Sequence, residues 1–459
     1  MLKIFQKAKN QFIRTSIVLF LILSFLILLY TFYISEINFQ GSKHEKYIKY
    51  YILSLFLILF FLTSLRFSKK FQEYLVIITF STIISLYTFE FYYFLKFDYR
   101  VTTVKYKKIV KESKIKIYED FKKMNIQSIP YYRVEKEFLH NNQVIFPVSG
   151  VSKIKTIYCN ENNKQINYMS DRYGFRNEDK EWDNKKIDVV LIGDSFAQGA
   201  CVDNKNTLSA NMKKKSDLSI INLGISGHGP LKELVVLREY AEFIKPKKIF
   251  WFFYEGNDLT KDLEAELSSD FLKKYFHPDF KQDLIKKQKN IDNLLLKDFR
   301  KKMLFENQTN DSITKLNNNH VSKFKDFLEN TKYLRLWAVR NILKKNISKK
   351  KIDPEFKKIL KLAKNEVNSW GGKLYFVYLP EKTRYQNTFY REVYSDQFRN
   401  KKKILDIAHS LNLQVIDVDD DIFYEIKNPT DLYYLHFNES GYKIISNHLS
   451  GYIKNEYYF

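Results

Sequence analysis

Three long apolar runs dominate the first hundred residues of the chain. Residues 15–34 carry no charge, and residues 50–65 and 74–95 are similar, apart from Glu90 near the end of the third run. A bilayer hydrocarbon core of about 30 Å needs about 20 helical residues to cross it, and lysine or arginine flanks each run. We therefore expect three membrane-spanning helices within residues 1–96, with the lipid bilayer as a partner.

Basic residues near these runs indicate an orientation. Positive charge is enriched in the cytoplasmic segments of membrane proteins. In this chain, basic residues lie before the first run (Lys3, Lys7, Lys9, Arg14) and between the second and third runs (Arg66, Lys69, Lys70). An odd number of spans places the termini on opposite sides. We expect a multi-pass protein of the cytoplasmic (inner) membrane with its long C-terminal part on the extracytoplasmic side. The basic residues between Arg100 and Lys111, which follow the third run, argue against this orientation.

From residue 183 onward, short valine- and isoleucine-rich runs alternate with stretches of helical spacing. The pattern predicts strands at 187–192, 219–223, 248–254, 373–378 and 413–418, and helices at 231–244, 354–369 and 401–411. Such β–α alternation is typical of a parallel sheet with helices on both faces. Residues 183–459 are thus expected to form an α/β domain with a doubly wound parallel sheet.

Two stretches depart from this alternation. Residues 97–182 predict a helical stalk followed by a small β-rich lead-in, in which a turn at Gly174-Phe175-Arg176 packs Phe175 under the sheet. Residues 263–351 are rich in lysine with apolar residues at roughly helical spacing, which predicts a helical insertion. The insertion has two open interpretations. It could be a lid that shapes the site where the acceptor of a reaction binds, or a solvated helical segment with no catalytic part.

Composition narrows the class of protein. Aromatic residues make up 17% of the chain, which excludes a largely disordered protein. The net charge of +24 comes from lysine scattered through the whole sequence, without zinc-finger spacing or an RNP pattern. We expect no nucleic-acid partner, and an anionic membrane surface or acidic glycan fits the charge better. Two distant cysteines, Cys159 and Cys201, make no framework and no metal site. They could pair in an oxidising compartment, but we expect two free, partly buried thiols.

Four short blocks carry candidate chemistry. They are Gly193-Asp194-Ser195 after the first expected strand, Asn222–Gly227 after the second, Glu255–Asp258 after the third, and His436–Gly441 near the C-terminus. Gly-Asp-Ser alone is a weak signal, but four blocks in this order are far more specific. In this order the chain resembles the SGNH (GDSL-type) hydrolase family over roughly residues 187–455, and the resemblance implies a flavodoxin-like fold.

The resemblance also implies roles. Ser195 would be the nucleophile and His436 its general base, while the Ser195 and Gly227 backbone N–H groups and the Asn257 side-chain amide would form the oxyanion hole. Gly224 is an alternative donor in the same block, but Gly227 matches the Ile-Ser-Gly part of the family pattern. No cofactor and no metal ion are implied.

The chain departs from the family at one position. The usual aspartate lies three residues before the histidine, where this chain has Tyr433. Asp431 is our preferred orienting acid for His436, through a bulged loop. A Ser195–His436 dyad and a loss of activity both remain open.

For the other polar residues we expect structural rather than catalytic roles. Asp194 and Asp258 are expected to fix their own loops, and His228, followed by Gly-Pro, is expected in an exposed loop. The aspartates at 417 and 419–421 lack ligand spacing and indicate a solvated turn.

These observations favour a membrane-anchored serine esterase or acyltransferase that acts on ester groups, such as O-acetyl groups, of a cell-envelope glycan. An acylated glycan or small ester is the expected substrate. One alternative is a non-catalytic glycan-binding or polysaccharide-assembly protein on the same fold, which the Tyr433 departure keeps open. The other is a basic membrane-surface protein that acts through charge alone.

Overall fold

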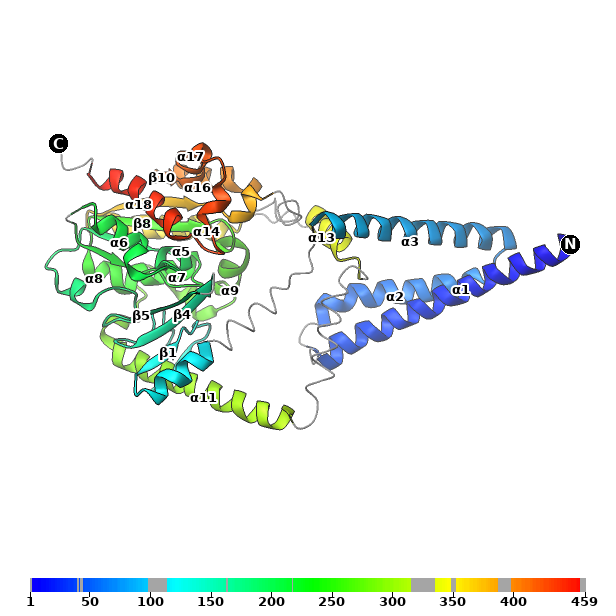
Figure 1. The fold of residues 1–459 in the computed structure, drawn as a ribbon, viewed down its shortest axis with the longest axis horizontal. Coiled ribbons are helices and arrows are strands. Elements are labelled where there is room, and N and C mark those ends of the chain that lie inside the picture. Colours follow the sequence, from blue (N-terminus) through cyan, green and yellow to red (C-terminus); the bar gives the residue numbers. More distant parts are fainter. Residues whose placement is uncertain are drawn as a thin grey trace. The chain divides into compact units, whose positions relative to one another are not determined.

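The computed structural model describes residues 2–38, 41, 44–97, 114–161, 164–216, 218–314, 335–347, 352–386 and 398–454. Part of the expected stalk (98–113) and parts of the expected insertion (315–334, 348–351) lie outside the described residues. The chain forms two compact units (Figure 1). One contains α1–α3 and the first residues of α13, and the other contains the lead-in and the α/β domain.

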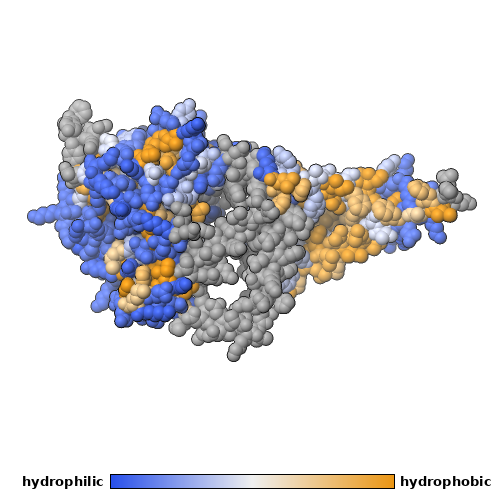
Figure 2. Space-filling model, in the orientation of Figure 1, coloured by the Kyte–Doolittle hydropathy of each residue, from blue (hydrophilic) through white to orange (hydrophobic). Residues whose placement is uncertain are grey.

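The first unit consists of long apolar helices. α1 (Leu2–Phe32) continues as the π-helix η1 (Tyr33–Asn38), followed by α2 (His44–Ser64) and α3 (Lys69–Phe97). All three are long and apolar enough to cross a membrane, and at most 22% of each apolar window is buried. Their apolar side chains therefore face outward, as the hydrophobic surface in Figure 2 shows. Such a surface is suited to lipid, in agreement with the three expected spans.

A buried carboxylate lies in this helical unit. Glu90 on α3 is 1% exposed and accepts hydrogen bonds from the backbone N–H groups of Ala338 (2.9 Å) and Val339 (3.0 Å). These residues lie in the first turn of α13 (Trp337–Ile347), whose free N–H groups favour a negative partner. Glu90 thus ties the end of the insertion to the third apolar helix.

The second unit is built on a five-stranded parallel sheet, as the sequence predicts. Its strands are β6 (Val189–Ile192), β7 (Ile220–Asn222), β8 (Lys248–Tyr254), β9 (Lys373–Leu379) and β10 (Gln414–Asp417). They lie in the order β10-β9-β8-β6-β7, and all neighbours are parallel. Counted from β6, this is the flavodoxin-like order, with the first strand between the second and third.

Helices cover both faces of the sheet (Figure 1). One face packs against α7 (Pro230–Val236), α14 (Pro354–Ser369) and α16 (Lys401–Ser410), and the other against α6 (Leu208–Lys213) and α18 (Glu439–Lys454). In β6, Val190 and Ile192 face the first group of helices, and Val189 and Leu191 face the second. Because both faces are buried, the strand is a continuous apolar run rather than an alternating one.

Short helices complete the unit. They are η2 (Asp179–Asp183), α5 (Ser195–Gln198), η3 (Asn204–Asn206), η4 (Leu237–Ala241), α8 (Glu242–Ile244), η5 (Asp258–Asp262), α9 (Leu263–Glu266), α10 (Asp270–Lys273), η6 (Lys274–Phe276), η7 (Leu284–Lys287), η9 (Lys382–Tyr385), α17 (Val418–Asp421), η10 (Phe423–Glu425) and η11 (Pro429–Leu432). The insertion also contains the long helix α11 (Gln288–Thr314).

The lead-in packs as a small β layer against the α/β domain. β1 (Ser128–Pro130) pairs in parallel with β4 (Lys155–Glu161), which pairs antiparallel with β5 (Lys164–Met169). β2 (Phe138–His140) and β3 (Gln143–Ile145) form a separate hairpin. After β5, Phe175 is fully buried and its ring lies 4.9 Å from that of Tyr240 between centroids, consistent with the expected packing turn.

A disulfide joins Cys159 to Cys201, so the expectation of two free thiols is wrong. Cys159 lies in β4 just after a register shift in the pairing with β5, and Cys201 follows α5 with a left-handed φ of 60°. The two Cα atoms lie 5.5 Å apart, within the usual range for a disulfide. Spacing in the sequence could not reveal this proximity.

Candidate active site

Ser195 lies where the strand order of the sheet changes direction. It follows β6, between β7 on one side and β8 on the other, which is the switch point where open α/β sheets bind ligands. Ser195 begins the short helix α5, and the preceding Asp194 accepts a hydrogen bond from the Phe196 N–H at 2.8 Å. Asp194 thus caps the helix, in the structural role expected of it.

His436 faces Ser195 from the loop before α18. Its Nε2 atom lies 2.9 Å from Ser195 Oγ, within hydrogen-bonding distance. The Phe196 ring packs beside the imidazole, with 4.9 Å between ring centroids. Ser195 is 7% exposed, so the hydroxyl lies at the base of the site rather than on open surface. The structure therefore brings together the two residues that the sequence singles out as nucleophile and base.

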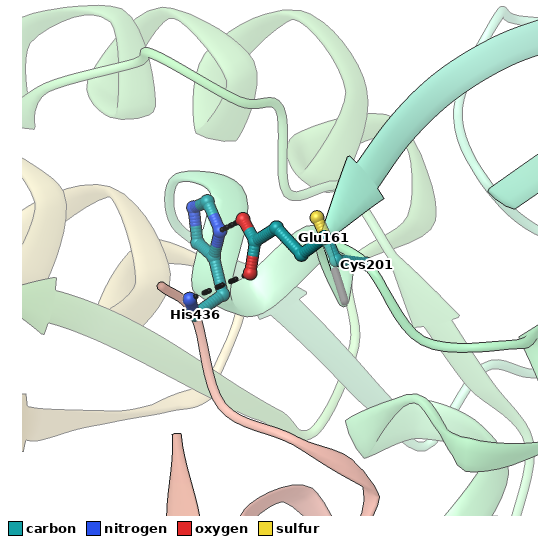
Figure 3. A group of neighbouring side chains, drawn as sticks. All are labelled: Glu161, Cys201 and His436. Atoms are coloured by element: carbon teal, nitrogen blue, oxygen red, sulfur yellow. Dashed lines mark hydrogen bonds and ion pairs between the residues drawn. The ribbon is translucent and has the colours of Figure 1, made fainter. Parts of the chain in front are cut away.

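The acid bound to His436 is Glu161, which the sequence analysis missed. Glu161 ends β4, and its Oε1 atom lies 2.7 Å from His436 Nδ1 (Figure 3). Its other oxygen accepts hydrogen bonds from the backbone N–H groups of Leu435 (2.9 Å) and His436 (3.1 Å). One carboxylate therefore holds both the ring and the backbone of the histidine.

Asp431 does not take the position expected of it. Its side chain is exposed, and its backbone carbonyl accepts a hydrogen bond from Asn438 Nδ2 at 2.6 Å. Tyr433, at the position of the family's aspartate, is buried and donates its hydroxyl hydrogen to the Pro380 carbonyl at 2.8 Å. The expectation for Asp431 is corrected because Glu161, from a distant strand, occupies the Nδ1 side of His436.

Electrostatics favour an ionised Glu161. Burial raises the pKa of this carboxyl, but the hydrogen bonds from the His436 ring and from the Leu435 and His436 backbone lower it more. The net pKa lies below the ordinary value for glutamate. At neutral pH the group is therefore a pure acceptor, which requires the proton of the imidazole to sit on Nδ1 and leaves Nε2 free to accept from Ser195.

Within the part of the chain that the structure describes, two groups of side chains have the donor atoms of metal ligands. Cys201 lies beside Glu161 and His436 (Figure 3), but its sulfur is in the disulfide and offers no thiolate. Asp417, Asp419 and Asp420 surround the Lys401 ammonium at 2.6 to 2.9 Å. Asp417 is buried and caps α17, so this is an ion-paired turn rather than the solvated one we expected.

The loop after β7 presents Gly227 with a left-handed φ of 82°, a conformation that favours glycine. Two anchors hold this loop: the Ser226 N–H donates to Gln198 Oε1 at 2.8 Å, and the Ser226 carbonyl accepts from the Tyr131 hydroxyl at 2.7 Å. The Gly224 N–H donates to Asn222 Oδ1 at 2.9 Å and is therefore already occupied.

The loop after β8 carries Asn257 and Asp258. Asp258 Oδ2 accepts a hydrogen bond from the Tyr254 N–H at 2.8 Å, which fixes this loop as expected. Asn257 donates from Nδ2 to Asp262. Asn257 as a whole is partly buried, while its Oδ1 atom is fully buried.

The structure also shows where His228 and Arg176 lie. His228 is 3% exposed rather than in an exposed loop, because residues of the lead-in cover it in a small cavity. Burial lowers its pKa well below the ordinary value and keeps it neutral. Arg176 is also buried and donates to the Gly199 (2.5 Å) and Val202 (2.7 Å) carbonyls, so it anchors the chain after α5.

No family model and no curated protein matches the chain. Solved structures do. A protein assigned to the lipolytic G-D-S-L family from Desulfitobacterium hafniense is 16% identical, covers 58% of this chain and 99% of its own, and has a TM-score of 0.30. An acetyl xylan esterase is 12% identical over 58% of this chain and 100% of its own, with a TM-score of 0.32.

A lipase/acylhydrolase from Enterococcus faecalis is 14% identical over 59% of this chain and 96% of its own, with a TM-score of 0.30. The first of these three proteins is described as a member of the G-D-S-L family, which the four sequence blocks resemble. At these identities and TM-scores the likeness assigns no role to any residue of this chain. The roles of individual residues therefore rest on the geometry of this chain.

Proposed function

We propose that the protein is a membrane-anchored serine esterase or acyltransferase that acts on ester groups, such as O-acetyl groups, of a cell-envelope glycan. One observation carries the proposal: Ser195 Oγ lies 2.9 Å from His436 Nε2, while Glu161 lies 2.7 Å from His436 Nδ1. A serine hydroxyl becomes a strong nucleophile when an oriented base takes its proton. Glu161, in place of Asp431, is the orienting acid in this proposal.

The reaction follows from these positions. Ser195 Oγ attacks the ester carbonyl as its proton moves to His436 Nε2, and the ionised Glu161 stabilises the imidazolium. The tetrahedral intermediate then collapses, and the leaving alcohol takes the proton from Nε2. An acyl group remains on Ser195 until water or a sugar hydroxyl attacks it by the same steps.

Negative charge on the intermediate requires donors that are already in place. We assign this role to the Ser195 and Gly227 backbone N–H groups and to Asn257 Nδ2. The engagement of the Gly224 N–H by Asn222 supports the choice of Gly227. Removing one oxyanion donor typically costs about 100- to 1000-fold in rate.

Labelling with a fluorophosphonate probe tests this proposal on the full chain in detergent. The parent should be labelled, whereas Ser195→Ala and His436→Ala should not be. Ser440→Ala, which removes an exposed serine at the start of α18, is the matched control and should label like the parent. A folded parent without labelling would favour the non-catalytic glycan-binding protein.

Water and a glycan compete as acceptors in the second half of the reaction. Release of free acetate from an acetyl ester without added glycan would support an esterase. Consumption of the donor only in the presence of glycan would support an acyltransferase. The chain is strongly basic, so an anionic glycan would be attracted to it and its concentration near the protein would rise. Ester groups on such a glycan are therefore suitable substrates in this proposal.

We also propose that the catalytic unit lies on the extracytoplasmic side of the membrane. The Cys159–Cys201 disulfide supports this side, because disulfides persist in oxidising compartments and are rare in the cytosol. The positive charge before α1 and between α2 and α3 favours the same orientation.

A thiol-blocking assay checks the orientation. In unfolded protein from cells quenched with acid, a maleimide of high mass should give no gel shift before reduction and a shift of two additions after it. A Cys159→Ser variant, which leaves Cys201 without its partner, should shift by one addition without reduction. Two additions to the parent before reduction, or digestion-resistant residues 100–459 in protease-treated spheroplasts, would contradict the orientation.

A further inference from the structure

The lead-in covers the Gly227 loop with a charged side chain. Arg133 lies so close that a Cβ atom added to Gly227 would be 2.6 Å from the guanidinium carbon. The Arg133 side chain is 37% exposed, and it forms ion pairs with Asp262 and Glu135. The two partners differ in burial: the Asp262 side chain is 3% exposed, whereas the Glu135 side chain is 69% exposed.

Asp262 links this arginine to Asn257. Arg133 Nη2 donates to Asp262 Oδ1 at 2.7 Å, and the other carboxylate oxygen accepts the hydrogen bond from Asn257 Nδ2. Asp262 is the last residue of the π-helix η5, and Asn257 is the residue that precedes this helix. The two residues are joined a second time, because the Asp262 N–H donates to the Asn257 carbonyl at 3.1 Å. Arg133, Asp262 and Asn257 form one continuous chain of contacts.

The direction of the Asn257 amide depends on its partner. An asparagine side chain has a donor end and an acceptor end of nearly the same shape, and an ionised carboxylate can only accept. Asp262 therefore selects the Nδ2 end and leaves the second N–H of the amide available. Among the described residues, Asn257 Oδ1 has no hydrogen-bond partner that would oppose or reinforce this choice.

The charge of Asp262 depends in turn on Arg133. Burial raises the pKa of the Asp262 carboxyl, and the adjacent Arg133 guanidinium is the strongest of the influences that lower it. The net pKa lies above the ordinary value for aspartate, and loss of the arginine shifts the balance further toward the protonated carboxyl, which is a donor and can bond the Oδ1 end of the amide instead. A reversed Asn257 would present oxygen lone pairs to a developing oxyanion, which is repulsive.

We propose that Arg133 is a positioning residue for the oxyanion hole, acting through Asp262 to keep the Asn257 amide turned with an N–H toward the substrate oxygen. This inference rests on the proposed acyl transfer at Ser195. It gives the lead-in a second task beside the delivery of Glu161, because Arg133 precedes β2 in the same segment. The effect of Arg133 is expected in kcat, since the oxyanion forms only in the transition state.

A double-mutant cycle on the full chain in detergent tests this inference with a p-nitrophenyl ester as substrate. Arg133→Met should lower kcat by about 10- to 100-fold with KM nearly unchanged, and Asn257→Ala by about 100- to 1000-fold. In the Asn257→Ala background, Arg133→Met should lower kcat by less than about twofold, because its target is gone. Arg133→Lys, which keeps the charge, should recover most of the loss.

Glu135→Gln is the matched control, because it removes the exposed ion pair of Arg133 and leaves the Asp262 contact intact. Its kcat should equal that of the parent. A general structural role of Arg133 would also disturb Glu161, and the losses from Arg133→Met and Asn257→Ala would then multiply, which overturns the inference. Thermal melting identifies an unfolded Arg133→Met, in which case Arg133→Gln, which removes the charge but keeps a polar side chain, enters the cycle under the same criterion.

The failure of the inference and that of the proposed function are distinguishable. An active parent with multiplying losses overturns only the role of Arg133. A folded parent no more active than Ser195→Ala overturns the proposed function, and the inference with it.

Discussion

Replacing Glu161 by glutamine should lower kcat by about 10,000-fold, the effect expected when the base of such a triad is held in the wrong tautomer. The two backbone N–H groups of Leu435 and His436 should hold the glutamine oxygen, as they now hold Glu161 Oε2. The NH₂ end then faces His436 Nδ1 and donates to it. With Nδ1 as an acceptor, the proton moves to Nε2, which can no longer accept from Ser195.

Steady-state ester hydrolysis by the full chain measures this effect. Asp431→Asn is the matched control, because it makes the same chemical change at an exposed carboxylate near His436. Its kcat should equal that of the parent. The assignment of the acid would be wrong if Asp431→Asn were the damaging change and Glu161→Gln the silent one.

Removing the Cys159–Cys201 disulfide should lower the free energy of unfolding by about 4 kcal/mol, from the loop of 42 residues that the bond closes. The cross-link restricts the unfolded chain, so its loss favours unfolding. We expect Cys201→Ser to lower Tm on the order of 10 °C. Thermal unfolding of the parent and the variant, monitored by circular dichroism in detergent, measures the difference.

Non-additivity is the internal control for this second prediction. Cys159→Ser and Cys201→Ser each remove the same bond, so the double variant should melt close to the single ones. Reductant should lower the Tm of the parent and leave all three variants unchanged. If the double variant loses the sum of both single effects, the two positions contribute through packing and the disulfide has no stabilising role.

The sheet was predictable because its signals are local. A strand that is buried on both faces is a short apolar run in the sequence. The strands that end at Ile192 and Tyr254 can therefore be predicted without knowing which strands lie beside them in the sheet. Ser195 and Asn257 follow such strands, which places them at one rim of the sheet, and His436 lies in the loop before the last helix. The pairing of Ser195 with His436 was therefore accessible from sequence order and family resemblance.

Glu161 was not accessible in this way. It ends a strand of the lead-in, carries no motif, and reaches His436 only through the packing of that small sheet on the α/β domain. The preference for Asp431 rests on nearness in sequence, but Asp431 lies exposed in the short helix η11. His228 was misjudged for a similar reason, since the Gly-Pro after it says nothing about the lead-in residues that cover it.

The segment order of the chain has a consequence for inheritance. The residues of the proposed triad follow one another as Glu161, Ser195 and His436, with the acid in the lead-in. A gene fragment that starts at the first strand of the α/β sheet would still encode all four sequence blocks. Its product would lack the acid, one half of the disulfide and Arg133. Recombination should therefore transmit residues 128–454 as one module. A gene copy that encodes the α/β part alone should accumulate inactivating mutations, because its product lacks these residues.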